Sequence, residues 1–305
     1  MSFQHEAMLY AGEEQFLAGT SAFIREGLGA GEPTLVMVAG DKIRLLREEL
    51  AEGAEGVAFA DMGVVGKNPA RIIPAWREFA AENAGRPLRG IGEPIRADRS
   101  AGELVECQHH ESLLNLAFAG VSDFRLICPY DAATLPPSVI DEARRSHPSV
   151  LVEGNARQSG LYRGHEHASN GFGAGLPEPP AVRHVLPFDA RGLSAVRRFA
   201  ARHAANAGFA TRRMNDVVLA VNEVAGNSVR HAGGQGILRV WRDGGRLVFE
   251  VRDEGRILEP LVGRRRPSVG AVGGHGLWLV NQVCELVQIR SSDAGTVVRL
   301  HLAPS

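Results

Sequence analysis

A carboxylate and a carboxamide lie one helical turn apart in the stretch Leu219–His231, LAVNEVAGNSVRH. At 100° per residue, Glu223 and Asn227 share a narrow helix face with Asp216 and His231. A base and a neutral oxygen ligand on one face could serve a metal–nucleotide site, although such pairs also occur on ordinary solvated helices. The opposite face is of core type and carries Met214, Val217, Val221, Ala225 and Ser228.

A second carboxylate stands at the end of a predicted strand. Residues Arg246–Arg252, RLVFEVR, alternate like a half-buried strand, and Asp253 follows directly before a turn that contains Gly255. A carboxylate there can accept a hydrogen bond from the exocyclic amine of adenine, whereas guanine presents an acceptor at that position. The pattern therefore favours ATP over GTP.

The segment Gly270–Val280, GAVGGHGLWLV, is rich in glycine and leads into a predicted helix over Leu277–Glu285. Glycines at a helix start let phosphate oxygens approach the backbone, and the free N–H groups and the helix dipole hold the anion. A glycine run alone is weak evidence. The order of the three segments is hard to obtain by chance: a helix with Glu-x3-Asn, a strand ending in Asp-x-Gly, and Gly-x-Gly-Leu opening a helix.

With these motifs, residues 184–302 resemble the GHKL ATP-binding fold, and within it the anti-sigma-factor serine/threonine kinases. The resemblance implies a Bergerat-type α/β sandwich that binds ATP and Mg²⁺, with Asn227 as the metal ligand and Glu223 as the catalytic general base. Asp253 would be the adenine-binding aspartate. The residues implied in cofactor binding are Asn227, Asp253, Gly255, Gly274, His275, Gly276 and Leu277.

The type of phosphate acceptor depends on Glu223. A serine hydroxyl needs a carboxylate to accept its proton, whereas a histidine acceptor does not, so Glu223 favours a hydroxyl acceptor. The resemblance implies a STAS-domain anti-anti-sigma protein and a sigma factor as partners, and a homodimer. Two alternatives stay open: a histidine kinase with His109 or His110 as acceptor, and a nucleotide-gated binding module without phosphotransfer.

The segment after Gly255, which would be the glycine of the family's first G box, departs from the family pattern. Arg256 stands where a second glycine is usual, which keeps the binding-module alternative open. The run Arg264–Arg266 could reach the triphosphate, contact an acidic partner or form a solvated loop.

The N-terminal half alternates helical and strand patterns, which predicts a mostly parallel sheet covered by helices. The segment Gly63–Asn68, GVVGKN, fails the Walker spacing twice and is not a phosphate loop. Helices are predicted near 14–28, 41–51, 68–83, 101–118 and 136–146, and strands at 34–38, 57–60, 88–92 and 124–128.

The segments GEPIRADRS, ECQHHESLLNLAF and CPYDAATLPPSVIDEARRSHP resemble the MEDS sensory domain over about residues 5–165. This resemblance implies a three-layer α/β input module, distantly like RecA-type ATPases, with an unknown small-molecule ligand. Glu93, Cys107, His110 and Tyr130 are ligand-binding candidates from motif position, although a core-packing role is the more common one for each histidine.

Length and composition bound the remaining possibilities. The 305 residues suffice for two domains, predicted at 1–165 and 184–305 with a Gly- and Pro-rich linker at 166–183. A net charge of −1 argues against direct nucleic-acid binding. The three cysteines lack metal-ligand spacing, which argues against a disulfide framework or a zinc site. No apolar stretch is long enough for a membrane span, and we expect a cytoplasmic protein.

Overall fold

The computed structural model describes residues 3–152, 154–170, 175–179, 182, 184–268 and 274–304. The chain divides into two compact units, Met1–Gly171 and Phe172–Ser305, and each is described by itself. Most of the glycine run predicted to hold phosphate, residues 270–273, lies outside the described residues, as does part of the predicted linker.

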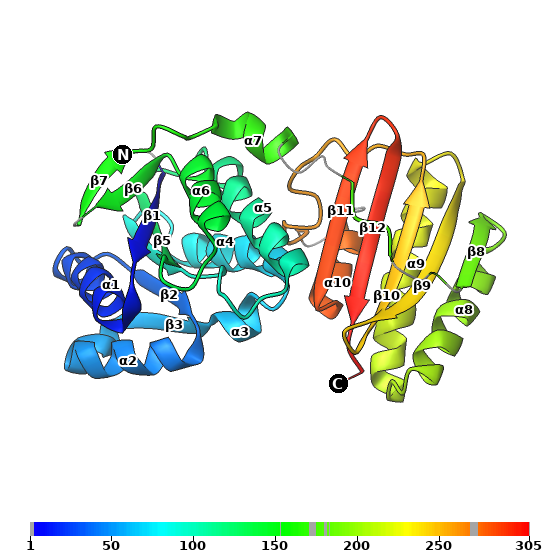
Figure 1. The fold of residues 1–305 in the computed structure, drawn as a ribbon, viewed down its shortest axis with the longest axis horizontal. Coiled ribbons are helices and arrows are strands. Elements are labelled where there is room, and N and C mark those ends of the chain that lie inside the picture. Colours follow the sequence, from blue (N-terminus) through cyan, green and yellow to red (C-terminus); the bar gives the residue numbers. More distant parts are fainter. Residues whose placement is uncertain are drawn as a thin grey trace. The chain divides into compact units, whose positions relative to one another are not determined.

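Unit 1 contains a seven-stranded sheet in the order β3-β2-β4-β5-β1-β6-β7 (Figure 1). All neighbouring strands are parallel except β6 and β7, which confirms the predicted mostly parallel sheet. Parallel strands buried on both faces explain why runs such as Leu35–Val38 are continuously apolar. The strands are β1 (Gln4–Tyr10), β2 (Thr34–Val38), β3 (Val57–Asp61), β4 (Leu88–Gly92), β5 (Phe124–Asp131), β6 (Ser149–Val152) and β7 (Asn155–Gln158).

Helices cover both faces of this sheet, which gives three layers. α1 and α2 contact one another and pack on one face, whereas α4, α5 and α6 form the layer on the other face. The longest helix of the second layer, α5, begins at a capping box in which Ser100 and Glu103 satisfy each other's backbone N–H groups. The helices are α1 (Gly12–Gly29), α2 (Gly40–Leu50), α3 (Met62–Val65), α4 (Ile72–Glu82), α5 (Ala101–Ala117), α6 (Pro137–Ser146) and α7 (Gly164–Asn170), with short 3-10 turns η1 (Ala51–Gly56) and η2 (Pro69–Arg71).

The strand β1 was not predicted, yet it lies between β5 and β6 inside the sheet. Its register places Ala7 opposite Cys128 and His5 opposite Leu126. Residues that pair directly point to the same face, so His5 and Cys128 both face the layer that contains α5. A second difference is α7, which occupies the first part of the segment predicted as an irregular linker.

Unit 2 is a two-layer sandwich, as predicted. Its five strands are antiparallel in the order β11-β12-β10-β9-β8, and the helices α8, α9 and α10 lie on one face (Figure 1). The strands are β8 (His184–Asp189), β9 (Gln235–Asp243), β10 (Arg246–Asp253), β11 (Leu286–Ser292) and β12 (Gly295–Leu302). The helices are α8 (Leu193–Asn206), α9 (Thr211–His231) and α10 (His275–Val283).

The core of unit 2 lies between these helices and the sheet. The apolar face of α9 supplies Val217, Val221 and Ala225, which are all fully buried against the inner strand residues. The face that carries Glu223 and Asn227 is half-buried, in line with the helical periodicity of the sequence.

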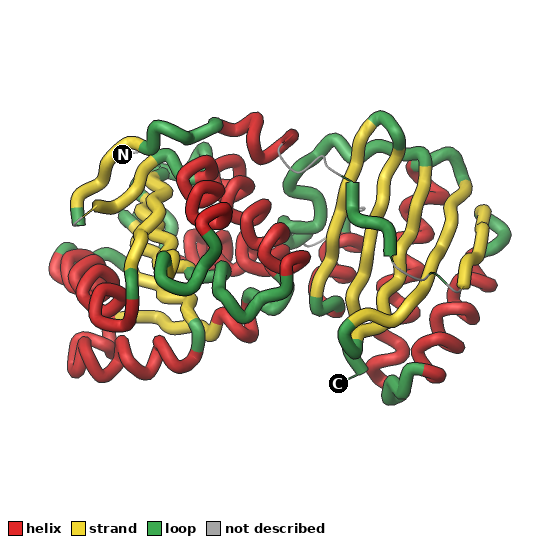
Figure 2. The backbone as a smooth tube through the Cα atoms, viewed as in Figure 1, coloured by secondary structure: helices red, strands yellow, loops and turns green. Residues whose placement is uncertain are grey.

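The outer face of this sheet carries an ion-pair network. Glu250 is fully buried and accepts hydrogen bonds from Arg239, Arg252 and Arg299 at 2.6–3.0 Å. The exposed Glu178 pairs with Arg239 and Arg252, and Arg299 also donates to the Pro177 carbonyl. The short segment 175–179 is therefore held on this face (Figure 2).

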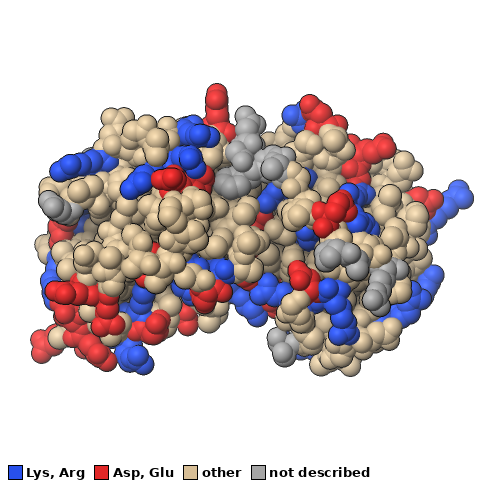
Figure 3. Space-filling model, in the orientation of Figure 1, with Lys and Arg blue, Asp and Glu red and all other residues tan. Residues whose placement is uncertain are grey.

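The surface view shows acidic side chains gathered at the lower left, where Figure 1 places α2, while basic and acidic groups alternate over unit 2 (Figure 3). No large basic patch covers the visible face. All three cysteines are buried, and none of them forms a disulfide. Within the described ranges, no helix is long and apolar enough to cross a membrane.

Candidate functional site

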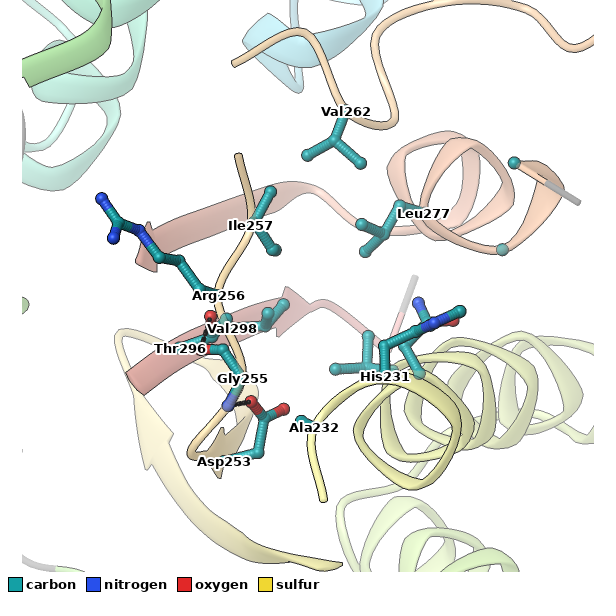
Figure 4. A pocket seen from close by; sticks show the side chains of 14 residues that line it. His231, Ala232, Asp253, Gly255, Arg256, Ile257, Val262, Leu277, Thr296 and Val298 are labelled. Atoms are coloured by element: carbon teal, nitrogen blue, oxygen red, sulfur yellow. Dashed lines mark hydrogen bonds between the residues drawn. The ribbon is translucent and has the colours of Figure 1, made fainter. Parts of the chain in front are cut away.

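A cavity of about 370 Å³ in unit 2 lies where α9, the end of β10 and the start of α10 meet (Figure 4). Of the predicted site residues, Asn227, Asp253, Gly255, Gly274, Gly276 and Leu277 line it. The structure thus brings together residues from the three sequence segments that were singled out for nucleotide chemistry.

Glu223 lies beside this cavity rather than in its lining. A Cβ atom on Gly276 would lie 2.7 Å from Glu223 Oε2 and 3.7 Å from Asn227 Nδ2, so both α9 side chains face the first turn of α10. Glu223 is half-buried and has no hydrogen-bond or ion-pair partner within the described part of the chain. A carboxylate of this kind is available to accept a proton.

The Asn227 side chain already forms a hydrogen bond within α9. Its Oδ1 atom accepts a hydrogen bond from Arg230 at 2.9 Å, on the exposed side of the same helix. A metal ion at Oδ1 would compete with this guanidinium, since the cation and Arg230 repel each other at short range.

Asp253 is held by two donors at the base of the cavity. Its Oδ1 atom accepts from the Gly255 backbone N–H at 2.9 Å, and its Oδ2 atom accepts from Ser228 Oγ at 2.5 Å. Each carboxylate oxygen retains a further lone pair that can accept a hydrogen bond from a ligand. Figure 4 shows the apolar side chains of Ile257, Val262 and Leu277 across the cavity from this carboxylate, a surface suited to a flat aromatic ring.

Gly255 permits the close approach of two chain segments. A Cβ atom at this position would lie 2.5 Å from the Ala232 Cβ atom, at the end of α9. The Gly255 carbonyl accepts from Thr296 Oγ1 at 2.8 Å, and Thr296 in turn contacts Ser291 Oγ at 2.8 Å. The turn after β10 is therefore fixed by β11 and β12.

Sequence reasoning missed several residues of the site. Ser228 was assigned to the core face of α9, yet it is both buried and bonded to Asp253. Thr296 carried no motif signal, because its role depends on pairing between β10 and β12. His275 was predicted to bind the cofactor, but it is exposed at the start of α10 and does not line the cavity.

Residues 256–268, between β10 and α10, are called the lid segment here, and its arginines take different positions. Arg256 borders the cavity, but its guanidinium points away and pairs with Asp293 at 2.5 Å. Arg264 is buried, whereas Arg265 is exposed and lies 3.9 Å from Glu259. None of the three is oriented by a contact with the Asp253 carboxylate.

The candidates in unit 1 are buried and have different hydrogen-bond partners. Glu93 follows β4 and accepts hydrogen bonds from Tyr10 and Lys42 at 2.6–2.7 Å. Burial raises the pKa of its carboxyl group, against the opposing effect of Lys42. Cys107 donates to the Pro94 carbonyl, and His110 and Tyr130 are buried between α5 and the sheet.

Comparison with known protein families agrees with this division into two kinds of domain. Residues 4–148 match the family described as MEDS, the methanogen/methylotroph, DcmR sensory domain. Residues 186–302 match the histidine kinase-like ATPase domain. The chain thus joins a MEDS domain to a histidine kinase-like ATPase domain of the GHKL type.

Among curated proteins, none matches the chain. Among solved structures, the chain is similar to the crystal structure of the RsbU and RsbW domains of Rv1364c from Mycobacterium tuberculosis, at 18% identity and a TM-score of 0.30. That match covers 40% of this chain and 32% of the other.

Proposed function

We propose that this chain is an ATP- and Mg²⁺-dependent protein serine/threonine kinase that regulates an alternative sigma factor. Its MEDS domain would sense a small molecule and bias the kinase domain. The observation that carries the proposal is the half-buried Glu223 carboxylate beside the cavity, one helical turn from Asn227 and without a partner among the described residues. A carboxylate at this place can accept the proton of an attacking hydroxyl, a role that nucleotide binding alone does not require.

The cavity residues fit ATP with its metal ion. Asp253 presents an oriented acceptor for the adenine amine, and the apolar residues opposite suit the purine ring. The first turn of α10 supplies backbone N–H groups that no carbonyl of the helix satisfies, which suits phosphate oxygens. Bound Mg²⁺ would supply charge neutralisation on the phosphates, and Asn227 Oδ1 is the oxygen that would hold it in place of the Arg230 guanidinium.

The residues of the chain have separate roles in this mechanism. Asp253 selects adenine, and Gly274 and Gly276 keep the phosphate-binding backbone free of side chains. Glu223 would accept the proton of a serine or threonine hydroxyl as that oxygen bonds to the γ-phosphorus of ATP and ADP leaves with the bridging oxygen. The released proton remains on the Glu223 carboxyl group until solvent removes it.

The proposed partners follow from the resemblance of the kinase domain to anti-sigma-factor kinases. We propose a STAS-domain anti-anti-sigma protein as the phosphate acceptor and a sigma factor as the protein sequestered when that acceptor is absent. A homodimer formed through the kinase domain belongs to the same proposal.

The histidine-kinase alternative has weak structural support. His110 is 1% exposed on α5, so a phosphate donor could reach it only after local unfolding. His109 is partly accessible and lies near Glu106, at 3.9 Å.

The deciding experiment incubates the full chain with γ-labelled ATP, Mg²⁺ and STAS-domain proteins of the same genome. Acid-stable label on a partner, lost in Asn227→Ala and reduced about 10² to 10⁴-fold in Glu223→Ala with ATP binding retained, is the expected result. Full transfer by Glu223→Ala would remove the general-base role. ATP binding without label on any partner would favour the nucleotide-gated binder, and acid-labile label on the chain itself would favour the histidine kinase.

A further inference from the structure

Unit 1 contains a buried cluster of four metal-ligating side chains that the proposed kinase chemistry does not use. His5 on β1, Glu111 on α5, Cys128 on β5 and His147 after α6 place their ligand atoms within 4.8 Å of one another. Each of the four is at most 2% exposed. Four separate elements therefore converge on one point between the sheet and the second helix layer.

Three of the six distances between the donor atoms are close to those of a tetrahedral metal centre. Glu111 Oε2 lies 3.1 Å from His5 Nε2 and 3.3 Å from His147 Nε2, and Cys128 Sγ lies 3.4 Å from His5 Nε2. Zinc bonds of about 2.0–2.3 Å at tetrahedral angles require donor separations of roughly 3.3–3.6 Å. Small shifts of the four side chains would therefore accommodate an ion.

Both imidazole rings are oriented for ligation through Nε2. His5 Nδ1 lies 3.1 Å from Asn115 Oδ1, and His147 Nδ1 lies 2.8 Å from the Ala143 carbonyl oxygen. An oxygen acceptor at Nδ1 assigns the ring proton to that atom, which leaves a lone pair on Nε2. This arrangement is the usual support of a metal-bound histidine.

Without an ion, two buried atoms of the cluster have no hydrogen-bond partner in the described part of the chain. Glu111 Oε1 and His147 Nε2 have no hydrogen-bond partner among the described residues, although both atoms are buried. Two imidazole lone pairs would then face a buried carboxylate and a thiol sulfur. Buried polar groups without partners are costly, and an ion can relieve that cost.

We propose that His5, Glu111, Cys128 and His147 together bind one divalent metal ion of the zinc class. A carboxylate and a thiolate carry two negative charges, so a divalent ion makes the buried centre neutral. Two nitrogens, one oxygen and one sulfur are the ligand types that zinc accepts. The spacing of the cysteines in the sequence argued against a zinc site. That spacing does not reveal this centre, because the centre uses only one cysteine and draws its other ligands from distant segments.

A closed four-ligand centre would tie the N-terminal strand to α5 and to the end of α6. The ion would therefore be a structural element of the sensory domain, loaded during folding and exchanged slowly afterwards. Binding or release of the ion would change the packing of β1 against α5. The supply of metal could affect the sensory domain by this route.

The test measures metal in the full chain purified without chelators or a histidine tag, by elemental mass spectrometry. About one zinc per chain, resistant to dialysis against a chelator until the protein is unfolded, is expected. Cobalt added to refolding apoprotein should give the visible bands of tetrahedral Co²⁺ and a near-ultraviolet thiolate-to-cobalt band.

Matched variants separate the cluster from its surroundings. Cys128→Ser should remove the thiolate band and His147→Gln should lower metal content by about tenfold or more, whereas Cys107→Ser, which changes another buried thiol facing Pro94, should leave both unchanged. If a cluster variant does not fold, the cobalt spectrum of the unaltered chain still decides. Absence of tightly bound metal and of any thiolate–cobalt band in that chain would overturn the proposal and leave a buried His–Glu hydrogen-bond cluster.

Discussion

A Cβ atom on Gly276 would lie 2.7 Å from Glu223 Oε2, so the first turn of α10 contacts the carboxylate that we propose as the general base. The contact involves the far end of a flexible side chain, which can move at little energetic cost. Gly276 therefore controls the position of the carboxylate more than the stability of the fold.

We expect Gly276→Ala to displace the Glu223 carboxylate and to lower phosphotransfer on the order of 10²-fold, because small misplacements of a catalytic group are costly. Thermal stability should change little. Gly175→Ala is the matched control, since a Cβ atom there meets no atom within 4 Å. Unchanged turnover in Gly276→Ala, measured with labelled ATP, would show that the position of Glu223 is not critical.

The orientation of Asp253 by Ser228 gives a second prediction. Ser228→Ala removes the 2.5 Å hydrogen bond to Oδ2 and should weaken ATP binding by about tenfold, as expected for a lost hydrogen bond to a charged group. Asp253→Asn should in addition reduce the preference for ATP over GTP, because the amide of the asparagine can donate a hydrogen bond to the guanine oxygen. Nucleotide titration by calorimetry measures both, with the exposed Ser194→Ala as control. Equal affinities in Ser228→Ala and the parent chain would contradict this account.

Local periodicity was sufficient to predict most of the fold. Strands β2 and β4 were predicted at their observed bounds, and in β2 the continuous apolar run Leu35–Val38 made the strand distinctive. β1 was missed because it begins near the N-terminus and mixes His5 and Glu6 with apolar residues. Both of those polar side chains are buried by partners from distant segments, Glu111 and Arg125, which no local pattern reveals.

The residues that line the cavity of unit 2 were predictable to the extent that they follow motif spacing. Glu223 and Asn227 are four residues apart on one helix, and their position beside Gly276 agrees with the segment order in the sequence. Thr296 and Ser228 join the site only through strand pairing and helix packing, so their contribution required the structure.

A lid-segment glycine supplies a stability prediction. Gly263 has φ +70°, and a Cβ atom there would lie 2.9 Å from the Leu277 Cβ atom. Gly263→Ala should therefore destabilise unit 2 by more than the roughly 1–2 kcal/mol of left-handed strain alone. Gly234→Ala, at φ +84° with open space around it, should cost only that strain. Denaturant unfolding of the two variants compares them directly, and equal losses would show that the Leu277 overlap relaxes freely.

The burial of the cysteines predicts low reactivity. Burial raises the pKa of the Cys107 thiol to about 12, so almost no thiolate exists there at pH 8. An alkylating reagent should label none of the three cysteines of the native chain within minutes, and all three after unfolding. Mass spectrometry of the labelled chain counts the modified sites. Rapid native labelling of Cys107 would mean that α5 opens more readily than its packing indicates.

The attachment of Glu178 to the sheet of unit 2 gives a pH prediction. Hydrogen bonds from Arg239 and Arg252 hold the pKa of Glu178 at about 2, below its usual 4.5. A depressed carboxyl pKa means that the attachment is fully present above about pH 4.5 and is lost as the pH falls toward 2. The ¹³C resonance of the Glu178 carboxyl group, assigned by its absence in Glu178→Gln, should titrate with a midpoint near 2 at low salt. Arg252→Gln should move the midpoint upward while Arg246→Gln leaves it unchanged, and added salt should also raise it, since the pair is exposed to solvent. A midpoint near 4.5 in the parent chain would mean that the segment 175–179 is not held on the sheet in solution.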